Sequence, residues 1–182
     1  ALFRKLGMRS YEGKVLTIVG DAYCRIGDYE KMKVIIDTAN PIIKDFNDIF
    51  SEGKINYLDA YYHLNNNDFS NAITYIDESI ELFNMAENKQ FETQALIEQL
   101  IMVIESGKEN VETIIKKIER LINKLKGTYS NSLFTSATLY IDAINGTINS
   151  ESLNSLFESI NDKQNAISFL SPLTFWYMAR AY

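Results

Sequence analysis

A repeat of about forty residues constrains this chain more than any other feature of its sequence. The stretch GDAYCRIGDYEKM at 20–32 is matched forty residues later by AYYHLNNNDFSNA at 60–72. A further shift of forty-two residues carries Phe69 to Val111 and Ile76 to Ile118, which keeps the apolar pattern but loses the identities. Periods of this length are typical of repeat proteins, in which a unit cannot bury its apolar face alone and stacks on its neighbours.

Within each unit the apolar residues recur with the period of an α-helix. The turns between them are short and polar, at residues 27–28, 65–68 and 106–108. Gly27 can adopt the left-handed conformation that ends one helix, and Asp28 can cap the next. Gly20 lies inside a helix, where glycine costs about 1 kcal/mol relative to alanine, so we expect it to admit a neighbouring helix. Two apolar stripes carry the argument: Val15, Leu16, Val19, Tyr23 and Ile26, and Ile73, Ile76, Ile80 and Phe83.

The pattern predicts an all-α fold of stacked antiparallel helix pairs. We expect one domain over residues 1–182, with about four pairs at 13–49, 53–88, 90–127 and 130–162 and a partial helix at 172–182 opened by Ser171 and Pro172. Pro41 is expected to kink or end the helix that begins near Tyr29. No stretch alternates in the manner of a β-strand. Both ends look cut within a repeat, so a fragment of a longer chain is expected.

Composition excludes several classes of function. The net charge of −6 argues against a general binder of nucleic acid or anionic membranes, which needs a basic face. No apolar run is long enough to span a bilayer. The single cysteine, Cys24, excludes an internal disulfide framework and favours a reducing compartment, so a cytoplasmic location is expected.

No catalytic constellation is visible, and we expect neither an enzyme nor a cofactor. His63 is the only histidine and cannot by itself form a two-histidine metal site or a triad. A lone thiol is reactive only if its pKa is lowered, so Cys24 is expected to be a small, partly buried residue. Lys116 follows Glu112 by four residues, which is ordinary pairing on a solvated helix surface.

Five residues around the first turn resemble the signature of the tetratricopeptide repeat. Small and aromatic residues of a first helix are followed by a Gly-Asp-aromatic turn: Gly20, Tyr23, Gly27, Asp28 and Tyr29. The opening residues are similar to the long-helix variety found in kinesin light chains and in large transcription activators. This resemblance implies a right-handed α-solenoid with a concave groove that binds a protein or peptide, within a larger protein such as a transcription regulator. Met32 and His63 depart from the family pattern.

By the same register, four side chains are candidates for the groove: Thr17, Asp21, Tyr57 and Tyr61. Tyrosines on a groove can anchor a peptide, or they can simply fill the contact between neighbouring helices. Family members that hold the acidic end of a chaperone use Lys, Asn and Arg at these places, so that function is rejected. The alternative function is structural: the helix pairs stack on copies of the chain or on adjacent domains, giving a homo-oligomer.

Overall fold

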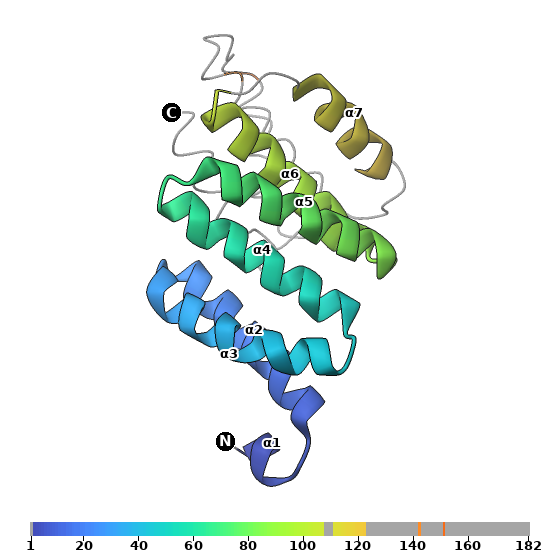
Figure 1. Cartoon of the computed structure of the whole chain (residues 1–182). Coiled ribbons are helices and arrows are strands. Elements are labelled where there is room, and N and C mark those ends of the chain that lie inside the picture. Colours follow the sequence, from blue (N-terminus) through green and yellow to red (C-terminus); the bar gives the residue numbers. More distant parts are fainter. Residues whose placement is uncertain (1, 108–110, 123–141, 143–150, 152–182) are drawn as a thin grey trace. The chain divides into compact units, whose positions relative to one another are not determined.

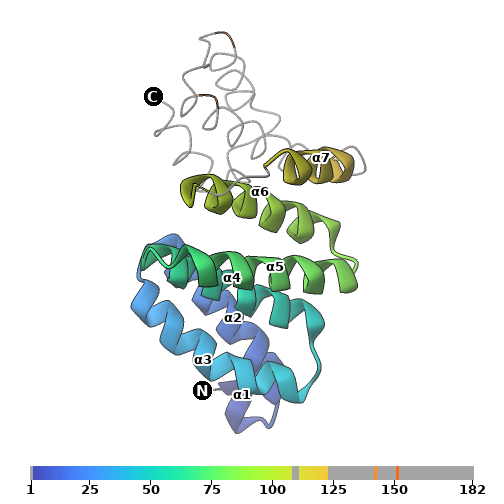
Figure 2. The same cartoon turned by 45° about the horizontal axis from the view of Figure 1, so that its top comes forward.

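The computed structural model of the chain describes residues 2–107, 111–122, 142 and 151. It divides into two compact units, Ala1–Ser106 and Gly107–Tyr182, which are treated separately below. The first contains six helices and the described part of the second contains one, shown in Figure 1 and from another angle in Figure 2. They are α1 (Leu2–Lys5), α2 (Arg9–Arg25), α3 (Tyr29–Asp45), α4 (Ile49–Asn65), α5 (Phe69–Met85), α6 (Lys89–Glu105) and α7 (Val111–Ile122).

The five helices α2 to α6 are each 17 residues long, and their first residues are twenty positions apart. The forty-residue repeat of the sequence is therefore a pair of helices of equal length. Each turn between these helices passes through a residue with positive φ, and before α3, α4, α5 and α6 a polar residue then caps the next helix, whereas Met8 before α2 makes no side-chain cap bond. The positive φ angles are at Gly7, Gly27, Asn47, Asn67, Glu87 and Gly107.

Four consecutive helices have the same side-chain cap. Asp28 accepts a hydrogen bond from the backbone N–H of Lys31, and Asp48, Asp68 and Asn88 accept the equivalent bonds at the starts of α4, α5 and α6. This bond satisfies one of the backbone donors that the first turn of a helix leaves free. The predicted roles of Gly27, with φ of 75°, and of Asp28 are thus confirmed.

Consecutive helices of the first unit pack against one another, α2 on α3, α3 on α4, α4 on α5 and α5 on α6. Because three-residue turns join them, neighbours run antiparallel, as Figure 1 shows. In addition α2 contacts α4 directly. A Cβ atom added at Gly20 would lie 3.0 Å from a side-chain atom of Ile36 and 3.1 Å from one of Leu58. The prediction that Gly20 admits a neighbouring helix is confirmed.

The core follows the forty-residue offset. Met32 and Ile36 of α3 are fully buried, as are Ala72 and Ile76 of α5. Burial therefore falls at equivalent positions of the second helices of the two pairs. Beside them, Phe83 is enclosed by the rings of Phe50 and Phe91, with ring centroids 5.7 and 5.3 Å away.

In the second unit, two predictions from the sequence concern residues of α7. Ile118, the residue onto which the forty-two-residue shift carries Ile76, is fully buried. On the exposed side, Lys116 Nζ lies 2.6 Å from a carboxylate oxygen of Glu112. The interpretation of this pair as surface pairing is confirmed.

Of the two effects expected at Pro41, a kink or the end of the helix, the second does not occur. Pro41 does not end its helix, since α3 continues to Asp45 with Pro41 inside it. Proline removes one backbone donor, while burial of Ile42 and Ile43 in the next turn holds the chain in place. The described residues contain no strand. The predicted pair at 130–162 and the helix at 172–182 lie outside the described residues.

Candidate binding surface

The first helices of the pairs, α2, α4 and α6, carry polar and aromatic side chains that interact between helices through a hydrogen bond and through their charges. We call five of them the first-helix cluster: Asp21, Arg25, Lys54, Tyr57 and Gln94. All of them come from helices that share one register, with α4 and α6 starting forty and eighty residues after α2. The cluster therefore crosses three successive layers of the first unit.

Tyr57 and Tyr61, both candidates for the groove, lie one turn apart on α4 and contact each other. Their ring centroids are 5.2 Å apart, and their hydroxyl oxygens are 3.4 Å apart. Gln94 of α6 donates a hydrogen bond of 3.0 Å to the Tyr57 hydroxyl. Both tyrosines are only 6% exposed. Their rings thus contribute packing between helices.

The two candidates on α2 occupy different environments. Thr17 is buried, and its hydroxyl donates to the backbone carbonyl of Lys14 at 2.8 Å. A threonine bonded in this way satisfies its own hydroxyl within the helix. Asp21 is partly exposed and forms an ion pair of 2.8 Å with Arg25, four residues later. Of the two, only Asp21 carries a charge, and its carboxylate is partly exposed to solvent.

Lys54 is the cation of the cluster that lies deepest. Burial lowers the pKa of its ammonium group; Asp21 opposes this effect and Arg25 adds to it. The ammonium lies 5.4 Å from the centre of the Phe91 ring. Lys54 makes no ion pair within the part of the chain that the structure describes. A partly desolvated cation of this kind favours an anionic or strongly polar partner.

The same surroundings suppress the chemistry of Cys24. Burial first, and then the carboxylates of Asp21 and Glu98, raise the pKa of its thiol to about 12 against the opposing effect of Arg25. Because the thiolate is the nucleophile, this thiol is unreactive near neutral pH. The expectation of a small, partly buried residue at Cys24 is confirmed.

Sequence reasoning missed Lys54, Gln94 and Glu98. A signal for each was present in the register: Lys54 and Gln94 align at the forty-residue offset. Glu98 falls where α2 has Ile18 and α4 has Leu58, and it is 2% exposed. A charged residue at an apolar position of a repeat is a candidate for a special role.

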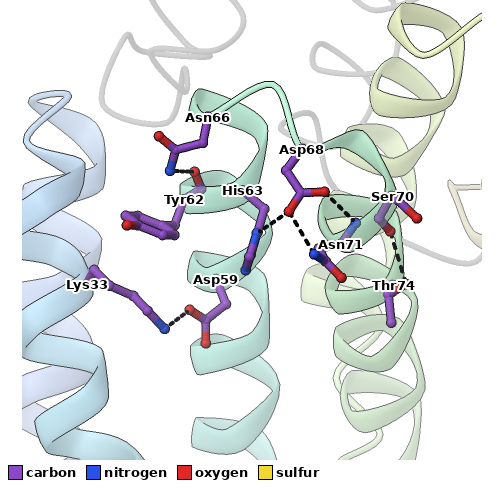
Figure 3. Close-up of polar contacts among 9 residues, drawn as sticks. All are labelled: Lys33, Asp59, Tyr62, His63, Asn66, Asp68, Ser70, Asn71 and Thr74. Atoms are coloured by element: carbon purple, nitrogen blue, oxygen red, sulfur yellow. Dashed lines mark hydrogen bonds and ion pairs between the residues drawn. The ribbon is translucent and has the colours of Figure 1, made fainter.

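A second polar network joins α3, α4 and α5, as Figure 3 shows. Lys33 of α3 lies 2.7 Å from a carboxylate oxygen of the buried Asp59 of α4. His63 Nδ1 lies 3.0 Å from the carboxylate of Asp68, which caps α5. The His63 ring also stacks on Tyr75. These contacts hold successive helices together, which agrees with a structural role for His63.

The described residues contain no group of three or more side chains able to hold a metal ion. Within them, too, no helix is long and apolar enough to cross a membrane. Comparison of the chain with models of protein families, with curated proteins and with solved structures finds no match.

Proposed function

We propose that this chain is a non-catalytic scaffold that binds a protein or a peptide. In this proposal the helix pairs form a right-handed α-solenoid of the tetratricopeptide type, and the first helices line its inner face. The observation that carries the proposal is the common register of α2, α4 and α6. Because of it, side chains at one repeat position from three helices lie along one surface.

Two contacts support placing the first helices on the inner side. α2 packs directly on α4, although α3 lies between them in the sequence. From α4 the contact continues to α6 through the hydrogen bond between Gln94 and Tyr57. A stack whose first helices approach one another curves toward them, which gives a concave face.

The chemistry of the cluster supports recognition of a polypeptide without bond making. Lys54 and Arg25 offer cationic donors beside the carboxylate of Asp21. Carboxylates and backbone carbonyls of a bound segment are suitable partners for such donors. Tyr57 and Tyr61, whose rings are buried, hold the helices that carry these donors. That the parent is a regulatory protein such as a transcription regulator, located in the cytoplasm, remains a proposal from the family resemblance and the composition.

A displayed library of random twelve-residue peptides tests the proposal. We expect the wild-type chain to enrich a set of related peptides, which are then measured by fluorescence anisotropy. Lys54→Met keeps the side-chain stem and removes the cation, and it should weaken binding about tenfold or more, the cost of a charge-assisted hydrogen bond.

Lys116→Met is the matched control, because this lysine is exposed on α7. It should leave binding within twofold of wild type. Both variants are first shown to melt near the wild-type temperature. Failure of the wild type to enrich related peptides, or equal affinity of Lys54→Met for them, contradicts the proposal.

A further inference from the structure

Lys54 lacks the ion pair that the equivalent lysine has one helix pair earlier. Lys14 of α2 precedes Lys54 of α4 by forty residues, which is the repeat offset. Lys14 Nζ lies 3.2 Å from a carboxylate oxygen of Asp48, the residue that caps α4. Forty residues after Asp48, the cap of α6 is Asn88, whose amide has no charge. The second pair therefore does not supply its lysine with the carboxylate that the first pair does.

The cap residues at 48 and 88 do the same work for their helices. Asp48 accepts a hydrogen bond of 3.2 Å from the backbone N–H of Ser51, and Asn88 accepts one of 3.1 Å from that of Phe91. Asparagine and aspartate are equally good caps. Asparagine at position 88 therefore keeps the start of α6 and removes the negative charge beside the lysine.

The surroundings of Lys54 increase the effect of the missing carboxylate. Among the described lysines, three others form no ion pair within the described residues, namely Lys5, Lys44 and Lys117, but all three are exposed to water. Lys54 is only partly exposed, and its ammonium lies 5.4 Å from the centre of the Phe91 ring. Opposite charges attract one another more strongly where water is partly excluded. Of these four lysines, Lys54 therefore gains most from an anion supplied by another molecule.

The charges near Lys54 favour an anion with a single negative charge. Asp21 and Arg25 are the charged side chains that act on Lys54, and they pair with each other at 2.8 Å. Because their charges balance, one positive charge is left on Lys54. A carboxylate balances it, whereas a phosphate dianion would leave one negative charge uncompensated in a partly desolvated place. A carboxylate is also the group that Lys14 contacts in the first pair.

We propose that the polypeptide segment bound at the first-helix cluster carries an aspartate or glutamate side chain that pairs with Lys54. This carboxylate takes the position beside Lys54 that Asp48 has beside Lys14. The inference rests on the proposed function and names the chemistry of its partner, an acidic segment. It commits to a side-chain carboxylate, because a side chain supplies this group in the first pair.

The probes are the related peptides that the wild-type chain enriches from the random library, synthesised with an acetylated N-terminus and an amidated C-terminus. We expect them to share an aspartate or glutamate. Changing this residue to asparagine or glutamine keeps its shape and removes its charge. In fluorescence anisotropy with the full 182-residue chain, the amide counterpart should bind about tenfold or more weakly, the cost of a charge-assisted hydrogen bond.

Asn88→Asp tests the pairing from the side of the protein. It gives Lys54 a carboxylate within the chain, as Asp48 does for Lys14, and should weaken the acidic peptide about tenfold. In a chain that also carries Lys54→Met, Asn88→Asp should change the affinity by less than twofold, because the ammonium that it would occupy is gone. Asn88→Asp should melt at or above the wild-type temperature, since aspartate caps a helix as well as asparagine.

Asn84→Asp is the matched control. It adds the same charge four residues earlier, at an exposed asparagine whose side-chain oxygen already accepts a hydrogen bond of 2.7 Å from Lys89. It should leave the affinity for the acidic peptide within twofold of wild type. A tenfold loss in this variant would show that added charge weakens binding without any pairing to Lys54.

Three further results overturn the inference. They are equal affinity for the acidic peptide and its amide counterpart, an equal loss from Asn88→Asp with and without Lys54→Met, and binding only of peptides with a free C-terminal carboxylate. The last result would place the end of a chain at Lys54 instead of a side chain. If related peptides are enriched without a shared acidic residue, this inference fails and the proposed function stands. If no related peptides are enriched, the proposed function itself fails.

Discussion

Gly53 lies where α4 packs closely on α5, and replacing it by alanine tests whether this close approach requires glycine. A Cβ atom there would lie 3.0 Å from two ring atoms of Phe83 and 3.2 Å from Leu82. The Phe83 ring cannot move aside easily, because it is fully buried between Phe50 and Phe91. Overpacking of a core costs about 1–3 kcal/mol.

The helix itself gains from the same substitution. Replacing glycine by alanine inside a helix contributes about 1 kcal/mol. With a steric cost near the top of its range, Gly53→Ala should lower the free energy of unfolding by about 2 kcal/mol, from about 3 kcal/mol of strain offset by about 1 kcal/mol of propensity. For a chain of this size the melting temperature should fall by roughly 4–8 °C.

Gly13→Ala is the matched control, forty residues earlier in α2. A Cβ atom there would lie 2.7 Å from Cδ1 at the far end of the Ile43 side chain and 3.1 Å from Cγ2 of Ile42, so it meets aliphatic side chains and not an aromatic ring. The gain in propensity is common to both variants, so the difference between them measures how much more the ring of Phe83 costs than the aliphatic side chains at Gly13. We expect Gly13→Ala to stay within about 1 kcal/mol of wild type.

Chemical denaturation and thermal melting followed by circular dichroism measure both variants. Phe83→Leu should remove the penalty of Gly53→Ala, so the double variant should be more stable than the two single changes predict by addition. The reasoning is refuted if Gly53→Ala is as stable as Gly13→Ala, or if Phe83→Leu leaves its penalty unchanged.

Two further predictions concern titratable groups. Hydrogen bonds from the side chain and backbone of Lys31 lower the pKa of Asp28, and those from Asn71 lower the pKa of Asp68. Their stabilisation is present above the unfolded pKa of about 3.9 and is lost as the pH falls through the lower folded pKa values. Asn caps equally well without titrating, so a chain with Asp28→Asn and Asp68→Asn should lose less melting temperature between pH 5 and pH 2 than wild type, and an equal loss would contradict the assignment. At pH 8 the Cys24 thiol, with its pKa of about 12, should react with iodoacetamide at least about a hundredfold more slowly in the folded chain than in urea; similar rates by mass spectrometry would show that the thiol is not shielded.

Local structure was predictable because it depends on neighbours in the sequence. Gly27 predicts a helix end because glycine tolerates positive φ, and Asp28 predicts a helix start because its side chain can accept a backbone hydrogen bond; the structure has both. The apolar period of residues 73–83 predicts a helix with one buried face, and Ile76, Ile80 and Phe83 are buried. The length of α3 was not predictable from Pro41, since burial of Ile42 and Ile43 outweighs the local preference.

By itself, the sequence determined the all-helical class, the forty-residue pairing and the capped turns, because each follows from residues close together in the chain. Only the tertiary structure decided which side chains meet across helices. Tyr57 is buried and accepts a hydrogen bond from Gln94 of α6. The charges of Asp21 and Arg25 on α2 act on the pKa of Lys54 on α4. Ile18 is exposed, whereas Leu58, forty residues later, is buried. Contact between helices depends on the register and approach of elements far apart in sequence, and a repeat pattern specifies neither until the helices are packed.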